Sequence, residues 1–424
     1  MYCGTQHSIF FASSNRLTEI NVKDLKVGMY VAKLDKPWEE SNFLYQGFEL
    51  KNQADINAIK EQCEFVFIDI KKQNRTPKLE SIDTPYSKGW LETRIPPKKL
   101  TSFEKEIEHA GYVYQKTSNL IRSFMEDLTL GITVLNAKEA VAECVDSILK
   151  APDALLWMTK IKKSDSHTSQ HSINVCIYAI ALGRHLNLPI KELNNLGLCG
   201  LMHDLGKMSV PLGILDKPGK LDPDELIIMQ SHAKLGWKLL RSSGHIYEGA
   251  IDVAHSHHER LDGNGYPRKL TAEKITPFTR IVTVADVYDA LTSDRVYHKG
   301  RTHLEAITIM NKMCGTHLDP DLTHKFIECL GIYPPGSIVE MSNGEIAIVV
   351  ETNQKNRLKP KIILLLDKHK KPRTERMIDL SNICPDKSRQ DYRITKFVRP
   401  EDYGIDLKKY YHNGKLESLK FPKL

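Results

Sequence analysis

Histidine and aspartate recur in this chain in short strings that could bind metal cations. The first string is HDLGK at 203–207, and the second is HHERLDGNGYP at 257–267. Imidazole nitrogens and carboxylate oxygens are suitable ligands for divalent transition metals. Such cations lower the pKa of water and neutralise phosphoryl charge, which is what cleavage of a phosphodiester requires. The two strings therefore point to metal-dependent phosphoester chemistry.

Other candidate ligands lie on predicted helices around these strings. His167 and His171 are four residues apart and share one helix face, as do Asp286 and Asp289, which are three apart within a helix predicted over 280–291. His232 falls within a helix predicted over 224–240. Taken singly, each residue is explained more simply as a surface or hydrogen-bonded core group. Their combination with the two strings carries the prediction of a metal site.

The elements that must position these residues are mainly helical. The helical patterns at 104–125 and 137–149 are long, and 173–186 is apolar on most faces, which is typical of a helix buried in a bundle. His257 and His258 end a helix that begins near residue 249, and His203 and Asp204 end an apolar segment. A carboxylate has two oxygens, so Asp204 is suited to bridge two metals.

Smaller modules flank the helical region. Strands are predicted at 27–32 and 65–70 with a helix at 53–62 between them, which indicates a small α/β domain. Strands at 337–341 and 345–350 around Asn343-Gly344 form a predicted hairpin, followed by a third strand at 361–366 and a lysine-rich tail from about 385. We expect a mainly α protein with this division: α/β domain 1–75, Pro-rich linker 76–100, helical catalytic domain 101–330, and β-rich appendage with basic tail 331–424.

Composition limits the class of protein. The chain has 424 residues, 41% of them hydrophobic, and a net charge of +7. This mild basicity lacks a dense Lys/Arg stripe, so we do not expect binding to a nucleic acid polymer. The eight cysteines form no CxxC spacing, and no apolar run is long enough to span a bilayer. We therefore expect a cytoplasmic protein without membrane insertion.

The two strings resemble those of the HD-GYP family, a branch of the HD-domain metal phosphohydrolases that opens cyclic dinucleotides. The N-terminal segment LKVGMYV at 25–31 is similar to a domain of unknown function that often precedes HD-GYP domains. The resemblance implies an HD-type helical core that hydrolyses cyclic di-GMP or cyclic GMP-AMP to a linear dinucleotide, with mononucleotide as a further product. It also implies a role in bacterial second-messenger signalling.

Carried over residue by residue, the resemblance assigns seven ligands to two metals. The ligand positions are His171, His203, Asp204, His232, His257, His258 and Asp286. One metal would be held mainly by His171, His203, Asp204 and Asp286, and the other by Asp204, His232, His257 and His258. Asp204 and Lys207 are the expected catalytic residues. The residues expected to bind substrate are Lys207, Asp289, Arg295, Gly265 and Tyr266.

Two departures from the family pattern concern metal number and phosphate binding. Some members place a glutamate, a ligand to a third metal, where this chain has His167, so two metals are expected and His167 is a candidate for a third metal or a phosphate. A basic residue that often follows Arg295 is replaced by His298. Mixed nitrogen and oxygen coordination favours iron or manganese, with nickel and zinc compatible.

Other interpretations remain open. The chain could be a general HD-type nucleotide phosphohydrolase, although simpler HD enzymes lack the Gly-Asn-Gly-Tyr-Pro element at 263–267. It could also be a sensor that binds a cyclic dinucleotide without cleaving it, although no expected metal ligand is lost. The Gly-Tyr-Pro loop is a candidate contact for signalling proteins, and homodimerisation is left open.

Overall fold

The structure is a computed structural model in two compact units, residues 1–87 and residues 88–424, each taken by itself below. Within them the structure describes residues 17–36, 41, 43, 47–50, 52–69, 101–126, 130–161, 167–244, 246–294, 299–353, 355–383 and 392–407.

The first unit is a small α/β fold. Its four-stranded sheet has the order β1-β4-β2-β3. The elements are β1 (Leu17–Asn21), β2 (Tyr30–Leu34), β3 (Phe48–Glu49), α1 (Gln53–Lys60) and β4 (Phe65–Asp69). Ile56 and Ile59 of α1 are buried in its core, as their spacing predicts. The strand expected at 27–32 begins only at Tyr30, because Gly28 adopts a φ of +92° in a turn that precedes it.

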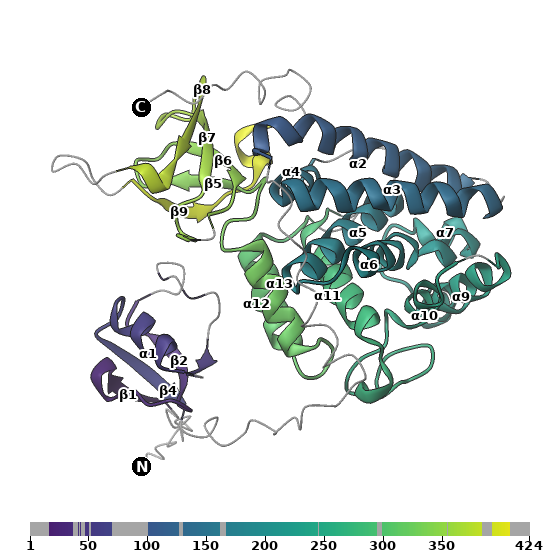
Figure 1. The fold of residues 1–424 in the computed structure, drawn as a ribbon, viewed down its shortest axis with the longest axis horizontal. Coiled ribbons are helices and arrows are strands. Elements are labelled where there is room, and N and C mark those ends of the chain that lie inside the picture. Colours follow the sequence, from purple (N-terminus) through teal and green to yellow (C-terminus); the bar gives the residue numbers. More distant parts are fainter. Residues whose placement is uncertain are drawn as a thin grey trace, which may run out of the picture. The chain divides into compact units, whose positions relative to one another are not determined.

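The second unit is dominated by a helical bundle (Figure 1). Its helices are α2 (Phe103–Glu126), α3 (Leu130–Lys150), α4 (Pro152–Met158), α5 (His167–His185), α6 (Ile190–Met202), α7 (Leu212–Leu215), α8 (Pro223–Gln230), α9 (His232–Ser242), α10 (Glu248–Ser256), α11 (Pro277–Thr292), α12 (His303–Met313) and α13 (Pro320–Leu330). The apolar helix α5 packs against α2, α6 and α11, so the pattern at 173–186 does mark a buried helix. The expected mainly α class, with a small α/β unit before the bundle and strands after it, is confirmed.

The single helix expected over 224–240 is instead two helices. α8 begins with a capping box in which Asp222 and Glu225 each accept a backbone N–H of the other, and it ends at Gln230. The Ser231 hydroxyl then donates to the carbonyl of Ile228, and α9 starts at His232. No residue of α8 is buried, whereas the first residue of α9 is. The break therefore separates an exposed helix from one that enters the core.

A five-stranded antiparallel sheet follows the bundle, in the order β8-β7-β6-β5-β9. Its strands are β5 (Ile338–Met341), β6 (Ile346–Glu351), β7 (Lys361–Leu366), β8 (Pro372–Asp379) and β9 (Ile394–Phe397). The predicted hairpin pairs Ile338 with Ile348, and Gly344 takes a φ of +84° in its turn. Strand β9 was not predicted. It lies within the lysine-rich tail expected from about 385, and it pairs antiparallel with β5, with Val339 opposite Phe397 and Glu340 opposite Lys396.

The sheet and the bundle share one hydrophobic core. Buried residues of β5, β6 and β7 belong to the same cluster as those of α2 to α6. Figure 1 shows α4 beside the sheet, and the backbone N–H of Thr352, just after β6, donates to the Asp153 carboxylate of α4 over 2.9 Å. Residues 101–330 and the strands after them are therefore physically continuous.

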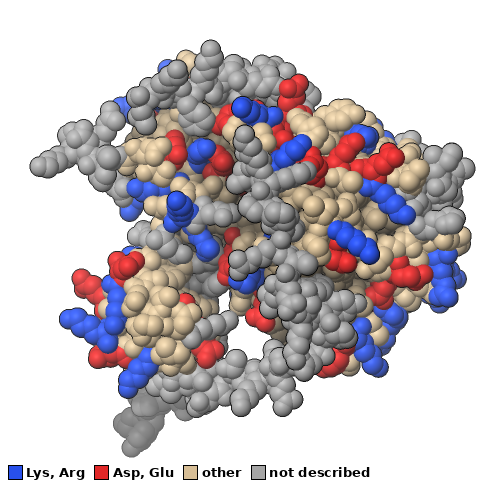
Figure 2. Space-filling view, in the orientation of Figure 1, with Lys and Arg blue, Asp and Glu red and all other residues tan. Residues whose placement is uncertain are grey.

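Charges are mixed on the surface of the second unit. On the face shown in Figure 2, Lys and Arg side chains of the described residues alternate with Asp and Glu. Among the helices that the structure describes, none combines the length and apolar character that a bilayer crossing needs. Six cysteines are free thiols in the described part of the chain: Cys63, Cys144, Cys176, Cys199, Cys314 and Cys329.

Candidate metal centre

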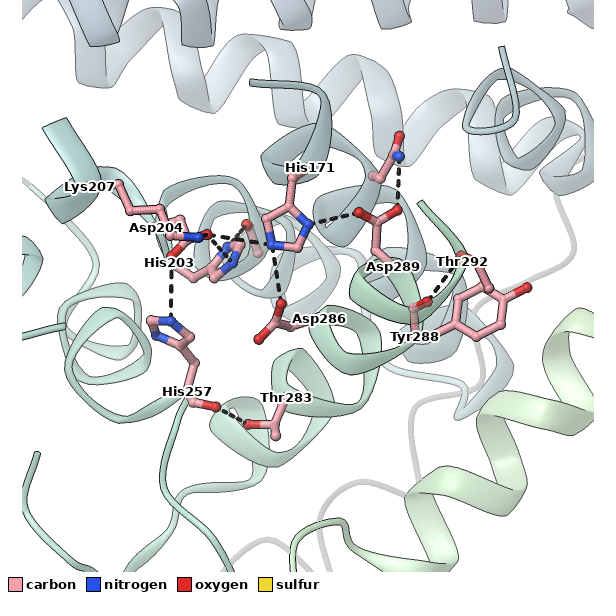
Figure 3. Close-up of polar contacts among 12 residues, drawn as sticks. His171, His203, Asp204, Lys207, His257, Thr283, Asp286, Tyr288, Asp289 and Thr292 are labelled. Atoms are coloured by element: carbon pink, nitrogen blue, oxygen red, sulfur yellow. Dashed lines mark hydrogen bonds and ion pairs between the residues drawn. The ribbon is translucent and has the colours of Figure 1, made fainter. Parts of the chain in front are cut away.

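Two groups of imidazoles and carboxylates meet in the interior of the bundle. In each group the ligand atoms lie within 4.8 Å of one another. One group is Asp204, His232, His257 and His258, and the other is His171, His203 and Asp286. They come from the start of α5, the end of α6, the start of α9, the end of α10 and the middle of α11. Figure 3 shows five of them: His171, His203, Asp204, His257 and Asp286. The structure thus brings all seven expected ligands together.

The Asp204 carboxylate lies between the two groups. Its Oδ2 is 3.4 Å from His171 Nε2 and 3.3 Å from His203 Nε2. Its Oδ1 is 3.4 Å from His232 Nε2 and 3.6 Å from His257 Nε2. One oxygen therefore faces each group, which is the arrangement a carboxylate needs to bridge two cations.

Backbone carbonyls orient three of the imidazoles. His203, His232 and His257 each point Nδ1 at a carbonyl three or four residues earlier in the chain, at 2.8, 2.7 and 3.1 Å. A carbonyl only accepts, so each Nδ1 carries the proton and each Nε2 presents a lone pair to the centre. The helix ends thus set the tautomer that metal binding requires.

His171 is oriented by a carboxylate instead. Its Nδ1 lies 2.7 Å from Asp289 Oδ2, and its Nε2 lies 3.1 Å from Asp286 Oδ1. Asp289 is 1% exposed and also accepts a hydrogen bond from Asn174. The expectation that Asp289 faces the substrate is therefore not met, because one helical turn beyond Asp286 the carboxylate points behind His171 rather than into the centre (Figure 3).

A glycine allows the HD string to approach α9. A Cβ on Gly206 would lie 1.9 Å from the carbonyl oxygen of His232. Only glycine permits this contact between the short helix η3 (Leu205–Ser209) and α9. Lys207 lies on η3, and its ammonium group contacts Asp204 Oδ2. The close approach thus fixes Asp204 and Lys207 relative to His232.

The Gly-Tyr-Pro loop packs against His258 of the group that also contains Asp204, His232 and His257. Gly265, expected to touch substrate, is buried, and a Cβ there would lie 2.5 Å from the backbone nitrogen of Arg260, so its role is steric. Tyr266 donates its backbone N–H to the carbonyl of His258 over 3.2 Å and stacks on that imidazole with ring centroids 4.7 Å apart. Glu259 fastens the loop by accepting two backbone N–H groups, from Arg268 and Leu270.

Burial keeps three imidazoles neutral. It lowers the pKa of His203, lowers the pKa of His232 to about 4, and holds the pKa of His258 well below its ordinary value. A neutral imidazole is the form that binds a metal. At neutral pH these side chains therefore offer free lone pairs.

The carboxylates remain charged despite burial. Burial alone would raise the pKa of Asp204, but Lys207 and the neighbouring imidazoles hold it well below its usual range. The positive charge on the His171 imidazole is also stabilised at this centre. Burial opposes that charge, yet hydrogen bonds to Asp286 and Asp289 raise the pKa of His171 to about 9. The centre therefore attracts positive charge strongly.

The residues fit a pair of divalent cations. His203 Nε2 and Asp204 Oδ1 are buried and have no hydrogen-bond partner within the described part of the chain. Buried polar atoms without partners are costly, and both atoms point at the centre. A cation bound by each group would satisfy them, and the mixed nitrogen and oxygen donors suit a first-row transition metal.

The structure does not describe every residue that the sequence singled out, and it shows two residues near the centre that the sequence did not predict. Arg295 and His298 lie outside the described residues, and His167 begins α5 with a side chain that is not described. Asn174 and Thr283 were not expected. Thr283 of α11 donates its hydroxyl to the carbonyl of His257 over 2.8 Å. Asn174 had a signal, since it lies three residues after His171 as a polar residue on an apolar helix.

Comparison with known proteins gives the class. The HD domain family matches residues 156–322, which include both ligand groups. Residues 17–137 match a domain of unknown function (DUF3391), and residues 338–407 match a KOW domain associated with HD domains. A cyclic di-GMP phosphodiesterase of Pseudomonas aeruginosa is 35% identical over 394 residues, or 92% of this chain and 94% of that protein.

Two further proteins are similar over a smaller part. The 3′3′-cGAMP-specific phosphodiesterase 3 of Vibrio cholerae is 30% identical over 239 residues, 56% of this chain and 50% of that protein. A solved HDG"Y"P protein from Bdellovibrio bacteriovorus aligns with 74% of this chain and 99% of its own at 19% identity, with a TM-score of 0.47. The chain belongs to the HD-GYP family of cyclic-dinucleotide phosphodiesterases, and an HD domain with these ligands implies a divalent-metal centre.

Proposed function

We propose that this protein hydrolyses cyclic di-GMP or cyclic GMP-AMP to a linear dinucleotide, with mononucleotide as a further product, in bacterial second-messenger signalling. The observation that carries the proposal is the position of Asp204, with one oxygen toward each ligand group. The related proteins named for cyclic di-GMP and 3′3′-cGAMP support this substrate class.

The chain's own residues define the roles in cleavage. His171, His203, Asp204 and Asp286 would hold one cation, and Asp204, His232, His257 and His258 the other. The mixed nitrogen and oxygen donors favour iron or manganese as the cations. Such cations would lower the pKa of bound water and offset the negative charge of the phosphate. Asp204 would join the two groups, because one of its oxygens lies toward each of them.

Lys207 supplies a positively charged side chain at this centre. Its ammonium group contacts Asp204 Oδ2, and its side chain is 23% exposed, so it can also reach a bound phosphate. Negative charge grows on the phosphoryl oxygens in the transition state, and a fixed ammonium group stabilises it. Arg295 is proposed to act in the same way. Tyr266, stacked on His258, is proposed as an aromatic surface for a base of the substrate.

Several finer proposals accompany this function. The free thiols favour action in a reducing compartment, the cytoplasm. The Gly-Tyr-Pro loop is proposed as a contact for signalling proteins and His167 as a candidate ligand for a third metal or a phosphate. We also propose the division into a small α/β domain at 1–75, a Pro-rich linker at 76–100, a catalytic domain at 101–330, and a β-rich appendage with a basic tail at 331–424.

The test is hydrolysis by the full-length protein loaded with Mn²⁺ or Fe²⁺. Cyclic di-GMP, cyclic GMP-AMP and a linear nucleoside triphosphate are supplied separately, and products are separated by chromatography. Conversion of a cyclic dinucleotide to its linear form supports the proposal. Cleavage of the triphosphate alone would support a general nucleotide phosphohydrolase, and tight binding of a cyclic dinucleotide without cleavage would support a sensor.

A further inference from the structure

A chain of buried hydrogen bonds runs from α2 to the metal centre. The Tyr114 hydroxyl of α2 donates to Asn174 Oδ1 over 3.0 Å. Asn174 Nδ2 donates to Asp289 Oδ1 over 2.9 Å, and Asp289 Oδ2 accepts from His171 Nδ1 over 2.7 Å. Tyr114, Asn174 and Asp289 are each 1% exposed. Three helices, α2, α5 and α11, are thus connected to one candidate metal ligand.

The direction of each bond follows from the groups involved. Asp289 is a carboxylate and only accepts, so Asn174 must turn its NH₂ toward it. The amide oxygen of Asn174 then faces Tyr114, whose hydroxyl is the donor that satisfies it. With Asp289 oriented in this way, His171 keeps its proton on Nδ1 and presents Nε2 to the centre. The hydrogen bonds thus favour one orientation each for the Asn174 amide, the Asp289 carboxylate and the His171 imidazole.

We propose that Tyr114 is a positioning residue for His171. It is not one of the candidate metal ligands, and it acts through Asn174 and Asp289. Without its hydroxyl, the buried Asn174 oxygen loses its hydrogen bond, and the amide that orients Asp289 is less firmly held. The proposal rests on the proposed function, because it concerns the metal centre of that enzyme.

The position of Tyr114 suggests what the chain of bonds is for. The match to the domain of unknown function covers residues 17–137, so it extends beyond the N-terminal unit and includes all of α2. In the second unit α2 packs against α3, α4 and α5. A small shift of α2 along α5 would lengthen the Tyr114–Asn174 bond and loosen His171. Helix α2 therefore belongs to the segment that this family match covers and also carries the first residue of the hydrogen-bond series that ends at His171.

Tyr114→Phe in the full-length protein tests the proposal, with Mn²⁺ as the probe. Binding is measured by calorimetric titration of the metal-free protein. We expect the affinity of the site that contains His171 to fall about fivefold, less than the roughly 10–100-fold loss usual for a residue bonded directly to a metal ligand. The site built on His232, His257 and His258 should keep its affinity. Excess Mn²⁺ should restore turnover.

Tyr178→Phe is the matched control. Tyr178 is a buried tyrosine of α5 whose hydroxyl lies 2.8 Å from Thr159 Oγ1, a partner outside the chain of bonds. The control should lower thermal stability about as much as Tyr114→Phe and leave both Mn²⁺ affinities unchanged. Equal Mn²⁺ binding by the two variants would overturn the role of Tyr114 and leave the proposed function standing. If the wild-type protein bound no Mn²⁺, both would fall.

A second pair of variants tests the route. In an Asn174→Leu background the connection from Tyr114 to Asp289 is already cut, so adding Tyr114→Phe should weaken Mn²⁺ binding no further. A second fivefold loss in that background would show that Tyr114 acts by another path and would overturn the proposal.

Discussion

Replacing Asp204 by asparagine should remove both metal ions at once. Asp204 is 1% exposed, and its two oxygens face different ligand groups at 3.3–3.6 Å from the imidazole nitrogens. The attraction between a unit negative charge and a divalent cation at about 4 Å is roughly 8 kcal/mol at an effective dielectric constant of about 20. That is about the whole binding free energy of a micromolar ligand. Neither group should retain its ion.

Asp286→Asn should remove one of the two metal ions. Asp286 belongs only to the group that contains His171 and His203. Metal content per chain, measured by mass spectrometry after dialysis against Mn²⁺, should therefore be two in the wild type, one in Asp286→Asn and none in Asp204→Asn. Asp252→Asn serves as the control and should keep two, since Asp252 of α10 pairs with Arg268 outside both groups.

Retention of one ion by Asp204→Asn would refute the reasoning. It would mean that one group holds its cation without this carboxylate, and that Asp204 does not join the two groups. Circular dichroism and the thermal midpoint of each metal-free variant show whether the fold is kept, so that metal loss is not confused with unfolding.

Two further predictions concern stability. In Gly265→Ala the new Cβ would lie 2.5 Å from the Arg260 backbone nitrogen, so the variant should lose about 1–3 kcal/mol of stability and its thermal midpoint should fall. A Cβ on Gly213 would have nothing within 4 Å, so Gly213→Ala should leave the midpoint nearly unchanged. Equal midpoints for the two variants would contradict the steric role of Gly265. Burial raises the pKa of Asp153 to about 7, so its neutral form stabilises the fold below about pH 4 and this contribution is lost as pH rises to about 7. Asp153→Asn, which keeps an acceptor for Thr352, should therefore show a smaller loss of thermal stability between pH 4 and 7 than the wild type, and parallel curves would contradict this.

The ligands could be predicted from the sequence because their motifs fix residue type and spacing together. His203 and Asp204 are adjacent, and His257 and His258 precede an unusual glycine-rich turn. The direction of Asp289 could not be predicted, since a residue three positions after Asp286 shares its helix face in broad terms but need not point into the same cavity. Only the packing of α11 on α5 places it behind His171.

Long-range partners had no local signal. Tyr114 lies 60 residues before Asn174, and α2 has a buried face on which a tyrosine is unremarkable. The strands β8 and β9 were missed because both are edge strands with few buried residues, so neither shows a strong hydrophobic alternation. Such elements are defined by their partners in the sheet rather than by their own hydrophobicity.

The common core of the bundle and the C-terminal sheet limits how this enzyme can be dissected. A truncated chain that stopped at Leu330 would strip the strands from α4 and open to water a core that both parts now fill, and it would leave the Asp153 carboxylate without Thr352. The HD and KOW matches are separate sequence families, yet the shared core should make them melt as one cooperative body. Transplanting the catalytic helices into another protein would therefore require carrying the strands along with them.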